Sequence, residues 1–322
     1  MTQWKEIINE FLPNIPVGKI QQNTIDIENK PIVLAMVQSI SMKEYDSSIF
    51  DNFGLVVFDE CHHLGAEVFS KCMPKVATNK MFGLSATPTR KDGLTKVFEW
   101  YIGPIVYKSK NKKSGKVDVK IIKYYEEDEN YGKEIVNYRR KPCIPKMINN
   151  ICSYEPRNTI IINNIKDCYN EGRNILLLSD RREHLLRINT LLTENSIDSG
   201  FYVGGMKPSA LKESEEKQVI LGTFSMASEG MDIPKLNTIL LASPKSDIVQ
   251  SIGRILREKE ENRKKIPLII DINDNFSIFI NQSKKRLTYY NKNKYDIIIV
   301  NKDGTHYEMQ KEKSINMNVC LI

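Results

Sequence analysis

Seven short apolar runs recur along the chain, and most of them end in small or polar residues. They cover residues 32–40, 53–60, 80–87, 174–180, 218–224, 237–243 and 267–272. Continuous apolar runs of this kind are typical of strands that are buried on both faces of a parallel sheet. Between the runs, residues 157–172 and 182–195 carry isoleucine and leucine at helical spacing. The pattern therefore predicts an α/β fold.

The polar, basic stretch "KSKNKKSGK" (108–116) interrupts this pattern and suggests a boundary between two lobes. We predict an N-terminal lobe at 1–107, a connector with some strand of its own at 108–150, and a C-terminal lobe at 151–290. Residues 291–322 are predicted to form a small hairpin and tail, because "YDIIIV" and "THYEMQ" flank the turn-forming "NKDG". A chain of 322 residues has room for two such domains.

Composition narrows the class of protein. Hydrophobic residues make up 41% and charged residues 27% of the chain, which is typical of globular proteins and excludes wholesale disorder. No apolar run is long enough to span a membrane, and the first residues do not resemble a signal peptide, so we expect an intracellular protein in cytoplasm, nucleus or, if viral, virion. The net charge of +7 permits a nucleic-acid partner, and the six cysteines include no C-x-x-C pair.

The run "VFDECHHLGA" concentrates acids, a cysteine and two histidines. A zinc site would use Cys61, His62 and His63, but three consecutive residues rarely converge on one tetrahedral metal. Asp59 and Glu60 follow a predicted strand, where one carboxylate can reach Mg²⁺ through water and the other can polarise an attacking water molecule. The two acids could also simply begin a helix.

Four later stretches give this run its context: "SATPTRKDG", "ILLLSD", "GTFSMASEGMDIP" and "QSIGRILR" follow it in that order. Together with "DECH" they resemble motifs II to VI of the superfamily 2 helicases. "QWKEIINEFLP" is similar to the segment that carries motif Ia, and "LAMVQSI" to a strand after it. The details look most like the branch that contains XPB, phage UvsW and the relatives from poxviruses and other large DNA viruses. The resemblance covers nearly the whole chain and implies two RecA-like lobes with parallel sheets, with ATP, Mg²⁺ and nucleic acid as ligands.

The resemblance also assigns roles in the first lobe. Asp59 would hold Mg²⁺ through water, Glu60 would activate the hydrolytic water, and His62 would relay the state of the nucleotide to motif III. Cys61 and His63 are expected to be packing residues. Motif III itself would consist of Ser85, Ala86 and Thr87, although the two hydroxyls could instead satisfy backbone groups at a strand end.

In the second lobe, Arg254 and Arg257 are three residues apart and would share one face of a helix, as two cations aimed at one phosphate should. The resemblance implies that they are arginine fingers; a solvated basic helix is the alternative. The other nucleotide-binding candidates are Gly230, Asp232, Gln250 and Gly253. The candidates for contact with the nucleic-acid backbone are Gln38, Ser179, Thr223 and Ser225.

A phosphate loop of the form G-x-x-x-x-G-K-[ST] is not present in the sequence. The Gly-Lys pairs that begin at Gly18, Gly115 and Gly132 all lack the following Ser or Thr. We therefore expect the first lobe to lack its N-terminal strand, phosphate loop and helix, and to expose apolar surface in their place. This chain alone should bind and hydrolyse ATP poorly, unless a separate chain supplies the missing segment.

Three functions remain open at this point. The first is an ATP-dependent DNA or RNA helicase or translocase that acts in viral transcription, replication or repair. The second is a catalytically inactive nucleic-acid-binding or complex-assembly remnant, or one piece of a split helicase. The third is the motor subunit of a restriction enzyme, which the sequence favours least because no nuclease-like cluster of acids and lysine is present.

Overall fold

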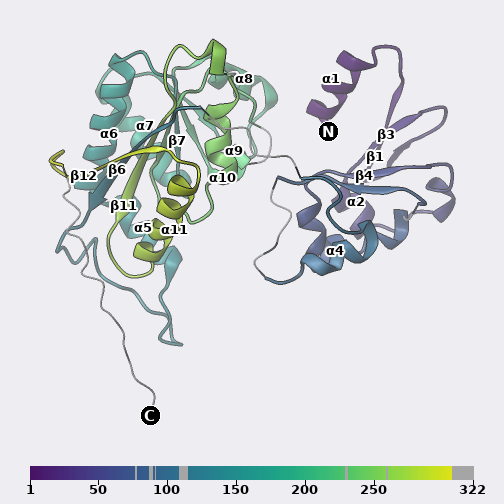
Figure 1. Cartoon of the computed structure of the whole chain (residues 1–322), viewed down its shortest axis with the longest axis horizontal. Coiled ribbons are helices and arrows are strands. Elements are labelled where there is room, and N and C mark those ends of the chain that lie inside the picture. The colour runs from purple at the N-terminus through teal and green to yellow at the C-terminus, as the bar shows by residue number, and fades with distance from the viewer. Residues whose placement is uncertain are drawn as a thin grey trace. The chain divides into compact units, whose positions relative to one another are not determined.

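The chain divides into two compact units, Met1–Lys110 and Asn111–Ile322 (Figure 1). The structure is a computed structural model that describes residues 1–76, 78–86, 90, 92–108, 115–228, 231–258 and 260–306. Thr87 and Gly230, two of the predicted site residues, lie outside these ranges. Among the described helices, none combines the length and the apolar character that crossing a membrane requires.

The first unit contains two small sheets. One has the strand order β2-β1-β3 and the other is the parallel pair β4-β5. The strands are β1 Val17–Gln21, β2 Thr24–Asp26, β3 Ile32–Ala35, β4 Val56–Phe58 and β5 Met81–Gly83. The helices are α1 Thr2–Phe11, α2 Val37–Met42, α3 Glu67–Ser70 and α4 Thr95–Ile102, with the 3₁₀ turns η1 Ser47–Ile49, η2 Cys61–Gly65 and η3 Pro74–Val76.

Only one face of the β4-β5 pair is covered. Phe58 packs into a cluster of buried side chains that also contains Leu64, Met73 and Phe98. A Cβ atom on Gly83 would lie 2.8 Å from the Cys61 sulfur, so the close approach of β5 to η2 requires glycine at this position. The opposite face is formed by large apolar side chains that are 47–51% exposed: Leu55, Val57, Phe82 and Leu84. The first unit thus exposes apolar surface, as predicted from the sequence.

The second unit is built on a seven-stranded sheet in which every strand pairing is parallel, with the order β12-β6-β11-β10-β7-β9-β8. Its strands are β6 Asp118–Tyr124, β7 Ile175–Leu178, β8 Ser199–Tyr202, β9 Val219–Gly222, β10 Thr238–Leu241, β11 Leu268–Asp274 and β12 Asp296–Asn301. Its helices are α5 Ile144–Ser153, α6 Glu155–Asn170, α7 Arg182–Glu194, α8 Pro208–Glu216, α9 Phe224–Ser228, α10 Val249–Gly253 and α11 Phe279–Lys292, with η4 Arg254–Leu256 and η5 Glu260–Asn262.

Helices cover both faces of this sheet (Figure 1), and each face has its own hydrophobic core. Leu177 of β7 points into the core that α5, α6 and α7 share, whereas its neighbours Leu176 and Leu178 point into the core that contains α9 and α10. All three leucines are fully buried. This alternation explains why the central strands are continuous apolar runs in the sequence and confirms the predicted α/β fold.

The run at 32–40 is only half a strand. β3 ends at Ala35 and α2 begins at Val37, so Gln38 lies in the first turn of a helix, exposed, rather than on a strand as the sequence predicted.

The connector differs from the prediction, and the first strand of the C-terminal hairpin has an additional partner. β6 lies inside the segment predicted as a connector, yet it pairs with β11 on one side and β12 on the other. The reason is burial, because Val119, Ile121 and Tyr124 of β6 are each 1% exposed. β12 lies in the predicted hairpin, but it is a parallel strand of the same sheet. The turn of the predicted hairpin is present, because Val300 and His306 form an antiparallel bridge and the Asn301 amide donates to the Thr305 carbonyl at 2.8 Å. The rest of its second strand lies outside the described residues.

Candidate functional site

The carboxyl ends of β4 and β5 bring motifs II and III together. The Leu84 amide donates to the Phe58 carbonyl at 2.8 Å, and the Cys61 amide donates to the Leu84 carbonyl at 2.9 Å. Between these two bonds the backbone of Glu60 adopts a left-handed conformation with φ 46° and ψ 48°, which is uncommon for a residue other than glycine. The turn places the two acids at the end of β4 and directs the chain into η2.

Both oxygens of the Asp59 carboxylate are oriented by hydrogen bonds. The indole Nε1 of Trp4, from α1, donates to Oδ2 at 2.9 Å, and the Glu60 amide donates to Oδ1 at 3.0 Å. Asp59 is nevertheless exposed. An oriented carboxylate that solvent can reach fits a Mg²⁺ ion held through water. Among the described residues no group of three or more His, Cys, Asp or Glu side chains is arranged to hold a metal.

His62 connects the acid pair to motif III. Its Nδ1 lies 2.8 Å from the Ser85 hydroxyl oxygen and 3.2 Å from Oε2 of Glu60. The guanidinium of Arg90 donates to the His62 carbonyl at 2.7 Å and fixes the backbone beneath the ring. The structure therefore brings together three of the predicted residues at one strand edge, Glu60, His62 and Ser85. Ala86 follows Ser85 and is exposed.

The two residues predicted to be packing residues lie beside this site. Cys61 is 5% exposed, and burial, followed by the charge of Glu60, raises the pKa of its thiol. A thiol of this kind is a poor nucleophile at neutral pH. The ring of His63 lies against that of His62, with 4.2 Å between the ring centroids.

In the second unit, the loops that follow β7, β9 and β10 are linked to one another. The ammonium of Lys245, after β10, lies 3.1 Å from Oδ1 of Asp180, after β7. The same nitrogen lies 5.2 Å from the centroid of the Phe224 ring, after β9. The carboxyl ends of parallel strands are where ligands of α/β proteins bind. Sequence reasoning did not identify Lys245.

Thr223 and Ser225 lie at the same edge. Their hydroxyl oxygens are 3.2 Å apart, and the Met226 amide donates to Oγ1 of Thr223 at 3.5 Å, at the start of α9. Ser225 is exposed and Thr223 half-buried. Both hydroxyls therefore stand where a phosphate backbone could reach them.

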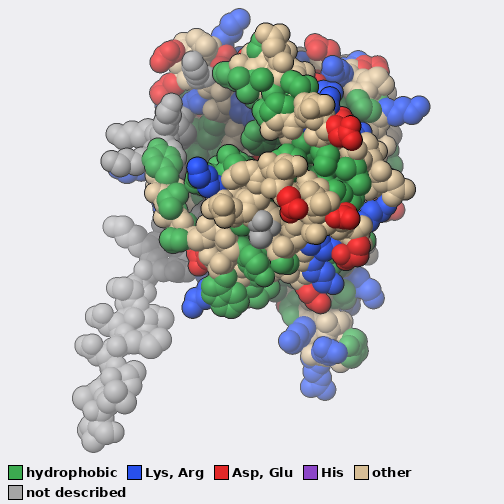
Figure 2. Space-filling model, turned by 90° about the vertical axis from the view of Figure 1, so that its right-hand side faces the viewer, with side chains coloured by type: hydrophobic (Ala, Val, Ile, Leu, Met, Phe, Trp, Pro, Cys, Tyr) green, Lys and Arg blue, Asp and Glu red, His purple; other side chains and the backbone are tan. Residues whose placement is uncertain are grey.

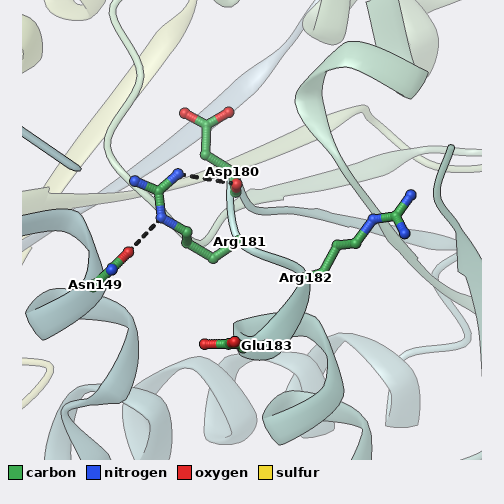
Figure 3. Close-up of a pocket in the computed structure, with 5 residues that line it drawn as sticks. All are labelled: Asn149, Asp180, Arg181, Arg182 and Glu183. Atoms are coloured by element: carbon green, nitrogen blue, oxygen red, sulfur yellow. Dashed lines mark hydrogen bonds between the residues drawn. The ribbon is translucent and has the colours of Figure 1, made fainter. Parts of the chain in front are cut away.

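A pocket of about 340 Å³ opens next to Asp180, at the start of α7 (Figure 3). Arg181 reaches across it and donates through Nε to Oδ1 of Asn149 at 2.5 Å. Arg182 extends to the other side, where its guanidinium donates to the Gly204 carbonyl. Guanidinium groups at such an opening are suited to phosphate. Their position directly after a buried strand was the signal that could have identified them.

The structure contradicts the expectation that Ser179 contacts nucleic acid, because this residue is fully buried. Its hydroxyl oxygen lies 3.0 Å from Nδ1 of His184 and accepts the Arg181 amide at 3.2 Å. His184 in turn lies 3.0 Å from Oδ1 of Asn158. Burial, with a further contribution from the charge of Arg157, lowers the pKa of His184 to about 3. Ser179 and a neutral His184 thus fix the turn between β7 and α7.

The two motif VI arginines do not share one regular helix face, because α10 ends at Gly253 and Arg254 begins a 3₁₀ turn. They nevertheless reach the same segment. Arg254 donates to the carbonyls of Ala227, through Nε, and Met231, through Nη1 at 2.8 Å. Arg257 forms an ion pair with Asp232.

The other two motif VI candidates belong to α10. Gln250 is half-buried within it, and Gly253 is exposed at its last position. Motif VI and the described part of motif V are therefore joined by side-chain contacts.

Two buried ion pairs fix the segment after β10, because the arginine of each pair also donates a hydrogen bond to a carbonyl of that segment. Arg157 contacts Asp274 through two bonds of 2.7 and 2.9 Å and donates to the Ala242 carbonyl at 2.7 Å. Arg286 contacts Asp271 at 2.8 Å and donates to the Lys245 carbonyl at 2.6 Å. Both aspartates lie on β11. Neither pair was predicted from the sequence, although the acids within an otherwise apolar strand were a signal for them.

Comparison with known proteins identifies relatives that match most of the chain. Residues 1–90 match the family described as "Type III restriction enzyme, res subunit". A protein of Acanthamoeba polyphaga mimivirus, named as an ATP-dependent RNA helicase, is 40% identical over 289 residues, which cover 87% of this chain and 55% of the mimivirus protein. An African swine fever virus protein with the same kind of name is 24% identical over 92% of this chain and 62% of its own length. The chain thus spans about half to two thirds of these relatives.

Solved structures of other proteins resemble the fold of this chain. A variant of Saccharomyces cerevisiae Dbp5 bound to RNA and ADP BeF3 matches 94% of this chain with a TM-score of 0.63 and 11% identity, over 75% of its own length. An HsdR subunit of a type I restriction enzyme from Vibrio vulnificus matches 93% of this chain with a TM-score of 0.59 and 17% identity, over 58% of its own length. The fold is that of RecA-like helicase lobes.

Proposed function

This chain belongs to the superfamily 2 helicases, and we propose that it acts as the motor part of an ATP-dependent helicase or translocase that moves on DNA or RNA. The observation that carries the proposal is the position of His62 between Glu60 and Ser85 at the end of the β4-β5 pair. A contact of this kind supports coupling between nucleotide chemistry and motif III. The mimivirus relative, which carries a helicase name, adds support.

In this proposal, Asp59 would hold Mg²⁺ through water, and Glu60 would orient and polarise the attacking water molecule. Mg²⁺ held there would neutralise negative charge on the nucleotide phosphates. Arg254 and Arg257 supply positive charge to the transferred phosphoryl group, an effect worth about a thousandfold or more in rate. Asp232, Gln250 and Gly253 of the second unit are further candidates for contact with the nucleotide, with Gly230.

Contact with nucleic acid is proposed to run over the carboxyl edge of the second sheet. Thr223 and Ser225 offer hydroxyls, and Arg181 adds positive charge to the same edge, where Lys245 is paired with Asp180. Contacts of this type bind phosphates and carry no sequence information. In the first unit, exposed Gln38 is the candidate. The viral relatives favour action inside an infected cell, in transcription, replication or repair of the viral genome.

We further propose that the phosphate loop comes from a polypeptide segment outside this sequence, on a separate chain or joined to this one. The uncovered face of β4-β5, with Val57 and Phe82 about half exposed, supports this because a strand and helix laid against it would bury the apolar surface. The relatives are longer than the part that this chain matches, so they have room for such a segment.

Steady-state ATP hydrolysis tests the proposal. The chain alone should turn over ATP slowly or not at all, and the chain joined to a relative's phosphate-loop segment should show turnover that nucleic acid stimulates. Glu60→Gln should abolish that turnover, whereas Glu67→Gln, on neighbouring α3, should not. Stimulated turnover that survives Glu60→Gln would contradict the assignment of the water-activating base.

The second candidate is a nucleic-acid-binding or assembly protein without hydrolytic activity, which the missing phosphate-loop pattern favours. It predicts a gel shift that ATP does not change and no turnover in any assembly with a phosphate-loop segment.

A further inference from the structure

The segment between β6 and α5 contains a tight turn that projects from the second unit. The Cys143 amide donates to the Ile135 carbonyl at 2.6 Å, the Asn137 amide donates to the Lys141 carbonyl at 2.8 Å, and Val136 and Pro142 form an antiparallel bridge. We call residues 135–143 the basic turn. It corresponds to the blue-green loop that extends furthest below the sheet in Figure 1.

The tip of the basic turn carries one aromatic ring and three cations. Tyr138 is 87% exposed, and Arg139, Arg140 and Lys141 are exposed as well. The Arg139 guanidinium lies 5.2 Å from the centroid of the Tyr138 ring. Figure 2 shows Lys and Arg side chains gathered on a protrusion at the bottom of this face.

Its backbone is held in place by Asn137, without help from the Tyr138 ring or the three cations. The side chain of Asn137 accepts the amides of Arg139 at 2.9 Å and Lys141 at 3.1 Å. Arg140 adopts a left-handed conformation with φ 55°, and its amide donates to the Asn137 carbonyl at 2.9 Å. The turn is thus built by Asn137, and the ring and the three cations remain available to a partner.

Two acids of the preceding segment are already engaged, whereas exposed Glu134 lies directly before the turn. Glu126 pairs with Lys302 at 2.6 Å, and the carboxylate of Asp128 accepts bonds from Tyr154 at 3.0 Å and from the Asn130 amide at 2.8 Å. No acid occurs between residues 135 and 143. The local charge of the basic turn is therefore strongly positive.

We propose that the basic turn binds a single strand of DNA or RNA, with a base stacked on Tyr138 and phosphates contacted by Arg139, Arg140 and Lys141. An aromatic ring next to several cations matches what single strands offer, because every base has a face for stacking and every nucleotide carries a phosphate. A membrane surface would demand more apolar side chains than the tip provides. The inference rests on the proposed function, since it adds a second contact region for the same nucleic acid.

Fluorescence anisotropy of the full chain with a labelled single-stranded oligonucleotide tests the proposal. Tyr138→Ala should weaken binding by about fivefold to a hundredfold, as for a lost stacking contact of about 1–3 kcal/mol, and Tyr138→Phe should bind like the wild type. Changing Arg139, Arg140 and Lys141 together to Gln should reduce the slope of log Kd against log salt by about 2, at about 0.7 per phosphate.

The matched control changes three exposed lysines of α11 to Gln: Lys284, Lys285 and Lys292. It alters net charge equally and should leave the salt slope nearly unchanged. If the wild type binds an oligonucleotide and the basic-turn variants bind equally well, the turn serves another partner, such as a protein, and this inference is wrong. If the wild type binds no nucleic acid at all, the proposed function itself fails.

Discussion

The Nδ1 atom of His62 lies 2.8 Å from the hydroxyl oxygen of Ser85, so a histidine that follows one strand is bonded to a serine that follows the next. We expect the pair to be thermodynamically coupled. His62→Ala and Ser85→Ala should each destabilise the first unit, and the double variant should cost less than their sum by about 1 kcal/mol, the usual net worth of a hydrogen bond. Urea unfolding of the wild type, the two single variants and the double variant measures this difference in the free energy of unfolding. Ser70→Ala, whose hydroxyl bonds only within its own turn, to the Glu67 carbonyl, should be additive with His62→Ala.

The buried pair of Arg157 and Asp274 gives a second prediction. Both side chains are 0% exposed, so Arg157→Ala leaves a buried carboxylate without its counter-charge and should lower the free energy of unfolding of the second unit by about 3–5 kcal/mol. Replacing both partners, Arg157→Met with Asp274→Leu, should recover much of that loss. Arg187→Ala breaks an exposed pair with Glu155 and should change stability little. Equal effects of the Arg157 and Arg187 variants would contradict this account.

His184 makes the stability of the second unit depend on pH. Its pKa is about 3 in the folded chain against 6.5 for the free group, so between these values the unfolded chain binds more protons. The free energy of unfolding should therefore fall as the pH falls from 6.5 towards 3, by up to about 1.4 kcal/mol per pH unit from this residue. Chemical unfolding at a series of pH values would show a shallower dependence in His184→Gln. Parallel curves for the two proteins would count against a buried neutral imidazole.

The open face of β4-β5 should make the isolated chain associate with itself. Phe82 is 51% exposed and paired in register with Val57, which is 48% exposed, and exposed apolar patches of this kind promote association. Phe82→Glu should therefore shift sedimentation velocity towards the monomer with no loss of circular dichroism signal. Phe98→Glu places a charge in the core of the same unit, where Phe98 is 5% exposed, and should unfold it. An unchanged sedimentation profile for Phe82→Glu would show that this face does not drive association.

The sequence predicted the strands whose apolar runs are continuous, because burial on both faces leaves no room for polar positions. β7 is such a strand, with four consecutive buried residues. β6 was harder to place, since Asp118, Lys120 and Lys123 interrupt its buried positions. Its position beside β11 depends on contacts between residues far apart in the chain, which periodicity alone does not reveal.

The candidate site, like the fold, was predicted from the sequence only in part. Asp59, Glu60, His62 and Ser85 meet at one strand edge because they directly follow paired parallel strands. Ser179 occupies an equivalent position after β7, yet its side chain turns inward to His184. Whether a residue at a strand end faces solvent or the core depends on the neighbouring helix, and the sequence pattern does not contain that information.

The hydrogen bonds from Arg254 to the carbonyls of Ala227 and Met231 connect motif VI to the segment that contains Thr223 and Ser225. If this guanidinium turned towards a phosphate group, it would release the C-terminal side of α9 at the same moment. Arg254 would then alternate between two partners, the backbone carbonyls of the protein and the phosphate of the nucleotide. Under the proposed function, a nucleotide that draws Arg254 away would then change how Thr223 and Ser225 are held without contacting either of them.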